Sequence, residues 1–236
     1  MKHKISIKTL NYGVLSVYEF QQARIDTSEV VGIVLQTETI GLILALPLWD
    51  ERWSHTEQCV IVKNNDDYIG EAVALTSLSG LEQTKTIVET HSNDTEMYAA
   101  KRCWEYDCAG LQWYLPSLYE LAMLQAYKDE INSTLDQIGL SQAKLTDRYH
   151  WSSSEAGQPG AWLVNFSNGY FNSYGKYISC VVRAVCAFES LRGVLSTPSA
   201  TTIVTATNDP ELSDEDLVGL LKARGYSGQI TKTLVL

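Results

Sequence analysis

Two apolar runs near the start of the chain have the pattern of a buried β-hairpin. Val30–Leu35 and Leu42–Leu46 are almost entirely aliphatic, and the polar segment Gln36–Gly41 connects them. Short continuous apolar runs are typical of strands that are buried on both faces. The sequence therefore predicts a hairpin over residues 30–46.

The residues before this hairpin have a weaker pattern. Ile5, Ile7 and the segment Val14–Phe20 show partial period-two alternation. We expect short strands and loops over residues 1 to about 30.

The clearest helix signal lies in the middle of the chain. Ser117 and Glu120 form a capping-box pattern, and leucines follow at helical spacing, which predicts a helix from Leu118 to about Lys128. Apolar residues over 94–106 also recur at helical spacing, so a second helix is expected there, with Asp94 near its N-cap. The stretches 64–93 and 132–148 are polar or turn-rich and are expected to be mostly loop.

Strand patterns return towards the C-terminus. The candidates are Trp162–Phe166, Tyr170–Phe171 and Ile178–Phe188, and Asn168-Gly169 between the first two is a strong hairpin signal.

The composition changes after Phe188. Residues 193–208 are rich in Ser, Thr and Ala and resemble a linker. A short helix is predicted from Ser213 to Leu221, and a terminal strand over Ile230–Leu236.

Composition and charge exclude several classes of function. The chain has 236 residues, 45% of them hydrophobic, and its 18 basic and 28 acidic residues give a net charge of −10. This acidity argues against nucleic acid as a partner. Charged and polar residues interrupt every long apolar stretch, so neither membrane insertion nor a signal peptide is expected.

The cysteines and histidines do not form a metal-binding pattern. The five cysteines include no CxxC pair, and the four histidines are scattered singly. We therefore expect no metal and no cofactor.

Several segments, taken in order, resemble a known family. They are Val31–Val34 with Gly41–Ala45, Trp113–Ser117 with Glu120-Leu121, Trp151–Glu155, Ala161–Phe166 and Val182–Val185. Together they resemble the C-type-lectin-like domains of bacterial and phage proteins that share the DUF1566-type body. The resemblance implies an α+β, C-type-lectin-like fold, with two helices and a small antiparallel sheet, over residues 30–188. Residues 1–29 would then be an N-terminal extension, and 189–236 a linker with a small helix-strand tail.

Within this body, residues 168–182 are similar to the variable region of proteins diversified by retroelements in gut bacteria and their phages. In those genes adenines are the mutated positions, and AAC codons are preferred targets. Apart from Lys176 and the framing residues, every residue type in this run can arise from AAC by changes at adenines alone.

The composition of this region also suggests binding. Between Glu155 and Arg183 the only charged residue is Lys176, and tyrosines lie among Asn, Ser and Gly. Tyrosine with these small polar residues is typical of adaptable binding surfaces, although a Tyr-rich strand pair would look the same. Within the expected surface, 165–183, the candidate contact residues are Tyr170, Asn172, Ser173, Tyr174, Gly175, Tyr177, Ile178, Ser179 and Cys180.

The resemblance thus points to a non-enzymatic binding protein. The expected partner is a variable protein or a glycan on a host or neighbouring cell. The expected setting is a phage tail component, cytoplasmic until it is assembled, or an adhesin. Receptor-binding tips of this kind are often trimers, so a homo-oligomer is an open expectation.

Two other functions stay open on the same scaffold. Formylglycine-generating oxidases use paired cysteines, and a regular strand would place Cys180 and Cys186 on one face. Sugar-binding lectins of this fold use calcium, but Gln158-Pro159 is followed by Gly160, which offers no side-chain oxygen.

The remaining conspicuous residues have structural interpretations. Trp113, Trp151 and Trp162 are expected in the core. Arg183 is expected to pair with a carboxylate such as Glu155 or Glu120. A nucleophile among Ser152–Ser154 is not expected, because no elbow motif or base accompanies these serines.

Overall fold

The computed structural model describes residues 3–55, 69–76 and 80–187. The predicted linker, helix and strand after residue 188 lie outside these residues. The described segments belong to one compact unit, Met1–Gly193.

Strands and helices are interspersed along this unit. The strands are β1 (Lys4–Thr9), β2 (Val14–Leu15), β3 (Val30–Gln36), β4 (Gly41–Ala45), β5 (Trp49–Arg52), β6 (Tyr149–Glu155), β7 (Gly160–Asn165), β8 (Phe171–Gly175), β9 (Ser179–Val182) and β10 (Val185–Ala187). The helices are α1 (Val17–Gln22), α2 (Glu71–Ala74), α3 (Gly80–Thr90), α4 (Ala99–Trp104), α5 (Leu118–Ala126) and α6 (Lys128–Gln137), with 3₁₀ turns at Thr27–Glu29 and Ser141–Ala143.

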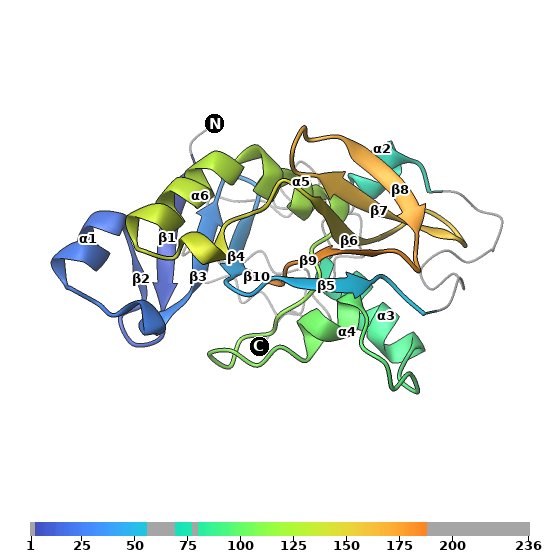
Figure 1. The fold of residues 1–236 in the computed structure, drawn as a ribbon, viewed down its shortest axis with the longest axis horizontal. Helices are drawn as coiled ribbons and strands as arrows, with labels where there is room; N and C mark the ends of the chain where they lie inside the picture. Colours follow the sequence, from blue (N-terminus) through green and yellow to red (C-terminus); the bar gives the residue numbers. More distant parts are fainter. Residues whose placement is uncertain (1–2, 56–68, 77–79, 188–236) are drawn as a thin grey trace, which may run out of the picture. The chain divides into compact units, whose positions relative to one another are not determined.

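These strands form two five-stranded sheets (Figure 1). We call them sheet A, in the order β10-β4-β3-β1-β2, and sheet B, in the order β5-β9-β6-β7-β8. Neighbours are antiparallel except β6 and β9, which are parallel. The mixed α and β architecture agrees with the predicted class. The expectation of one small sheet and two helices was too simple, because it left out sheet A and the shorter helices.

The N-terminal residues are part of sheet A and not an extension. β1 pairs with β3 from Lys4↔Gln36 to Thr9↔Val30, so it is an inner strand of the sheet. The predicted boundary at residue 30 therefore falls inside the unit. The expected strand over 14–20 continues only to Leu15, because a capping box at Ser16 begins α1.

Two helices occur where loops were expected. α3 buries Thr84 and Ile87, and the Thr84 hydroxyl donates to the Leu115 carbonyl at 3.1 Å. α6 buries Ile131 and Leu135 on an otherwise polar helix. Contact with the rest of the fold stabilises both helices. Because these contacts need only a narrow stripe of apolar residues, the sequence pattern did not indicate a helix at either place.

The strongest local predictions are confirmed. β3 and β4 form the expected hairpin, and α5 begins with the complete Ser117/Glu120 capping box. The segment 94–106 is helical only from Ala99.

The predicted core tryptophans are buried, as expected. Trp113 and Trp151 have no exposed surface, and Trp162 retains only 5%.

Candidate binding surface on strand β8

The predicted contact region begins at the turn between β7 and β8. The amide of Gly169 donates to the Asn165 carbonyl at 2.7 Å, and Gly169 adopts a φ of +77°. This conformation favours glycine, and a Cβ there would also approach the side chain of Gln125 at 3.2 Å. The Asn168-Gly169 signal is therefore confirmed, and it places Tyr170 at the tip of the hairpin with 70% of its surface exposed.

The predicted contact residues differ in their exposure. Those that are exposed are Tyr170, Ser173, Tyr177, Ile178 and Ser179, and those that are half-buried are Asn172, Tyr174 and Gly175. They follow β8, the outer strand of sheet B, and the turn that leads into β9 (Figure 1). Eight of the nine predicted residues are thus at least partly accessible on this edge.

Cys180 is the exception, and its assignment as a contact residue is wrong. It lies in β9, where it pairs with Glu51 of β5, and only 6% of its surface is exposed. Burial raises the pKa of its thiol to about 11. β9 lies between β5 and β6, and its consecutive residues Cys180, Val181 and Val182 are all buried, so both faces of the strand are covered there.

Two aromatic residues of β8 fix the strand on the sheet. The ring of Tyr174 packs against Tyr149 with centroids 5.0 Å apart. Phe171, which is half-buried, packs against the core cluster that includes Trp162 and Val164. These contacts leave Ser173, between them, exposed.

Lys176 holds the turn that presents Tyr177 and Ile178. Its ammonium forms an ion pair with Glu155, and both side chains have no exposed surface. The ammonium also lies 4.8 Å above the Trp53 ring. The Lys176 amide donates to Pro159 at 3.0 Å, and the Lys176 carbonyl accepts from the Trp53 amide at 2.9 Å. The lone charge of the Tyr-rich run is therefore an internal support and not part of the surface.

Arg183 pairs with neither Glu155 nor Glu120, and no ion pair with another carboxylate is found for it among the described residues. Its Nε donates to the Ala45 carbonyl at 2.6 Å and a terminal nitrogen donates to Ala143 at 2.5 Å. The two carboxylates expected as its partners have other contacts: Glu155 pairs with Lys176, and Glu120 accepts from Tyr114 and Ser117. Burial lowers the pKa of Arg183 to about 9.

The serines of β6 have structural roles, as expected. Ser152 donates to the Trp162 carbonyl at 2.7 Å, and both Ser153 and Ser154 donate to the Gln83 side chain. All three serines are buried.

A serine, a histidine and an aspartate that the sequence did not connect with one another lie close together near the Lys176 turn. Ser54 Oγ is 3.5 Å from His91 Nε2, and His91 Nδ1 is 4.0 Å from Asp94. Ser54 is only 1% exposed, and its amide bonds to the Lys176 carbonyl. Distances longer than a nucleophile–base contact and a buried hydroxyl indicate a supporting role. Only tertiary structure brings these residues together.

The two cysteines considered for oxidase chemistry do not share a strand. Cys180 lies in β9 of sheet B and Cys186 in β10 of sheet A, because the strand is interrupted at Arg183 and Ala184. The prediction of one regular strand with both thiols on one face is therefore wrong. Burial also raises the pKa of Cys186.

Among the described residues, no cluster of three or more His, Cys, Asp or Glu side chains is arranged to hold a metal ion. In the same part of the chain, no helix has the length and apolarity needed to span a membrane.

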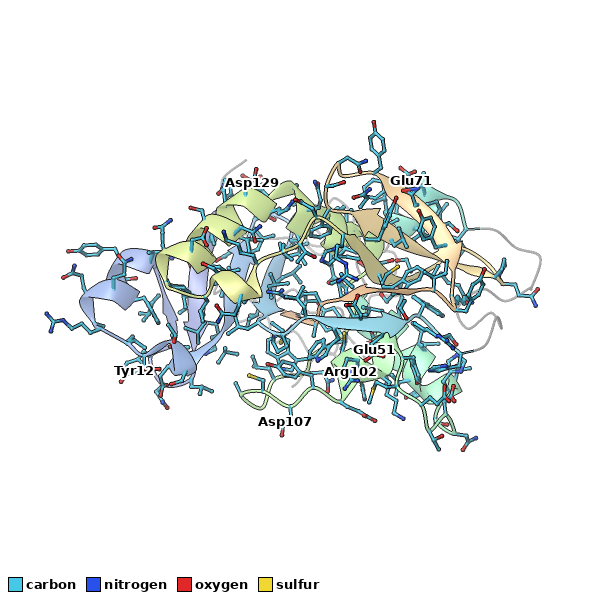
Figure 2. The ribbon with its side chains drawn as sticks, in the orientation of Figure 1. Tyr12, Glu51, Glu71, Arg102, Asp107 and Asp129 are labelled. Atoms are coloured by element: carbon cyan, nitrogen blue, oxygen red, sulfur yellow. The ribbon has the colours of Figure 1, made fainter. Side chains whose placement is uncertain are left out.

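A second group of exposed apolar residues, called here the Leu10–Tyr18 patch, lies far along the chain from β8. It consists of Leu10, Tyr12, Val14 and Tyr18, around β2 and α1, and Tyr12 and Tyr18 are 57% and 70% exposed. Figure 2 labels Tyr12 at this end of the unit. The predictions from sequence overlooked this patch, although its exposed tyrosines match those near β8.

Comparison with known proteins shows a likeness in fold. No family model matches the chain. No curated protein matches it either. Among solved structures it is similar to a fimbrial protein from Bacteroides ovatus, with a TM-score of 0.57 and 14% identity over 78% of this chain. The match spans about half (48%) of that protein's length. At this identity the likeness shows the fold alone.

Proposed function

We propose that this chain is a non-enzymatic binding protein that uses the exposed side chains of β8 and of the turns on either side of it to contact a protein or glycan on another cell. The observation that carries the proposal is the exposure of Tyr170 and Tyr177, at 70% and 60%, on a strand and turn held by buried contacts. Rigid, amphipathic tyrosines on a preorganised support bind with little loss of conformational entropy.

The proposal includes a C-type-lectin-like scaffold of DUF1566 type, whose surface at 165–183 is diversified. In support of diversification, the exposed residues of this stretch belong to the types reachable from AAC, and Lys176, which does not, is buried. A surface that varies needs a support that does not vary.

Of the two settings, adhesin and phage tail component, we favour the adhesin. A solved structure with a similar fold is described as a fimbrial protein, and fimbriae are surface appendages. The oxidase alternative is not supported, because Cys180 and Cys186 lie in strands of different sheets.

The test is binding of the purified full chain to a glycan array and to a panel of bacterial and epithelial cells. Tyr170→Ser with Tyr177→Ser should reduce any binding at least about tenfold, because buried tyrosine anchors typically contribute 2 kcal/mol or more. The matched control is Tyr12→Ser with Tyr18→Ser, which removes two tyrosines of similar exposure from the other patch. Equal losses in both double variants, or unchanged binding in the first, would contradict the proposal.

A further inference from the structure

The two sheets have four edges, and β8 differs from the other three. β2 and β10, at the edges of sheet A, have two and three residues. β5, at the other edge of sheet B, carries Asp50, Glu51 and Arg52, and its carboxylates pair with Arg148 and Arg102. Figure 2 labels the Glu51–Arg102 pair. Short length and charge are the usual means by which proteins prevent edge-to-edge pairing.

β8 has neither protection. It spans five residues, Phe171–Gly175, without charge and without proline. No strand pairs with its outer side within the described ranges of the chain.

The main chain of β8 also presents hydrogen-bonding groups outward. At one end of the β7–β8 ladder the Asn165 amide donates to Tyr170, and at the other the Lys176 amide donates to Pro159. Along an antiparallel strand, every second residue directs its amide and carbonyl towards the neighbouring strand. The main-chain groups of the even-numbered residues between these ends therefore point towards β7. The amides and carbonyls of Phe171 and Ser173 therefore point away from the sheet.

We infer that β8 pairs antiparallel with β8 of a second copy of this chain, with Ser173 on the two-fold axis. In this register each Phe171 lies opposite Gly175 of the other copy, and each Asn172 lies opposite Tyr174. Aromatic residues opposite edge glycines stabilise strand pairs, and no like charges meet. Tyr170 of one copy then lies beside the turn that carries Tyr177 of the other.

This pairing is isologous, the commonest form of homodimer interface. The two-fold axis is perpendicular to the sheet, so equivalent faces of both copies lie on the same side. A dimer would therefore present two adjoining copies of the proposed binding surface. The inference goes beyond the proposed function and does not depend on it, because self-association is measured without any ligand.

The experiment is sedimentation equilibrium of the full chain over a range of concentrations. We expect a monomer–dimer equilibrium. Ser173→Pro removes the outward amide at the centre of the interface, and an edge strand tolerates proline when that amide faces solvent. The dimer dissociation constant should rise about tenfold to a hundredfold, because one hydrogen bond is lost from each copy. Ser173→Ala keeps the amide and should dimerise like the unchanged chain.

A charge-swap pair tests the register itself. Ser173→Lys should weaken the dimer because it opposes a second lysine across the axis, and Ser173→Glu should do the same. In an equal mixture of the two variants, lysine and glutamate lie opposite each other, so association should be restored as a heterodimer. A register in which the two 173 positions lie apart would not give this rescue. A monomer at every concentration would overturn the inference. So would a dimer that the proline and lysine variants leave intact, since that dimer would use another surface, such as the Leu10–Tyr18 patch.

Discussion

At the scale of single residues, the buried Lys176–Glu155 ion pair is the contact on which the candidate surface depends most. A buried charge is stable only with a partner, and Lys176 has the Glu155 carboxylate and the Trp53 ring. Its main chain meanwhile bonds to Trp53 and Pro159, so the side chain and backbone together hold the turn before Tyr177.

We predict that Lys176→Met lowers the free energy of unfolding by about 3–5 kcal/mol, because it leaves Glu155 buried without its lysine. The double variant Lys176→Met with Glu155→Gln should lose less than the sum of the two single losses. Urea denaturation followed by circular dichroism measures all three. A Lys176→Met chain as stable as the original would show that the pair contributes little.

His150 should make stability depend on pH. Its ring is buried and stacks on Phe166 at 4.0 Å, and Nδ1 donates to the Arg148 carbonyl at 3.0 Å. Desolvation lowers its pKa from 6.5 to about 4. Between these values the unfolded chain binds more protons than the folded one, so stability is complete above pH 6.5 and is lost as the pH falls.

We predict that His150→Phe removes about 2–3 kcal/mol of the stability difference between pH 7 and pH 4.5. Phenylalanine keeps the stacking on Phe166, and the Arg148 carbonyl still accepts from the Phe166 amide at 3.0 Å. Thermal unfolding of both proteins at the two pH values measures this difference. The contributions of the other titrating groups are the same in both proteins and cancel. If both proteins lose the same stability between the two pH values, a group other than His150 causes the acid sensitivity.

At the scale of secondary-structure elements, one motif occurs in two environments. Ser16/Glu19 begins α1 at the surface, whereas Ser117/Glu120 begins α5 in the interior. In the buried box Glu120 accepts from the Ser117 amide and from the Tyr114 hydroxyl, each at 2.8 Å.

We predict that Glu120→Ala costs about 3 kcal/mol of unfolding free energy, because two buried donors lose their acceptor. Glu19→Ala, the matched control, should cost about 1 kcal/mol or less, because water replaces the exposed carboxylate. Chemical denaturation of the two variants decides the point, and similar losses would mean that burial of the box is unimportant.

Element prediction succeeded where the signal is local. The apolar runs of β3 and β4, the capping box of α5 and the Asn168-Gly169 turn all determine nearby structure through adjacent residues. It failed for α3 and α6, whose sequences are mostly polar. Distant partners, such as Leu115 for Thr84, stabilise these helices.

At the scale of the whole molecule, sheet B separates exposed residues, such as Tyr170 and Tyr177, from buried residues that support them, such as Lys176. If the surface is diversified, sequences of this gene from a natural population should vary at Tyr170, Tyr177 and Ser179, whereas Lys176 should be constant. Deep sequencing measures this, with the buried segment Trp151–Glu155 as the constant reference. Variation at Lys176 as great as at Tyr177 would contradict the division between support and surface.

The sequence by itself determined the mixed α and β class, the two hairpins, the buried tryptophans and the Tyr-rich run, because each depends on local patterning or on composition. The tertiary structure decided which of those residues are exposed. Cys180 is buried because it packs in a core cluster beneath β9, and Tyr170 is exposed because it ends a turn at the sheet edge. The tertiary structure also decided the partners of Lys176 and Arg183, because buried charged groups pair with the groups that the fold brings near them. The edge position of β8 likewise follows from strand order, which arises from contacts between distant residues.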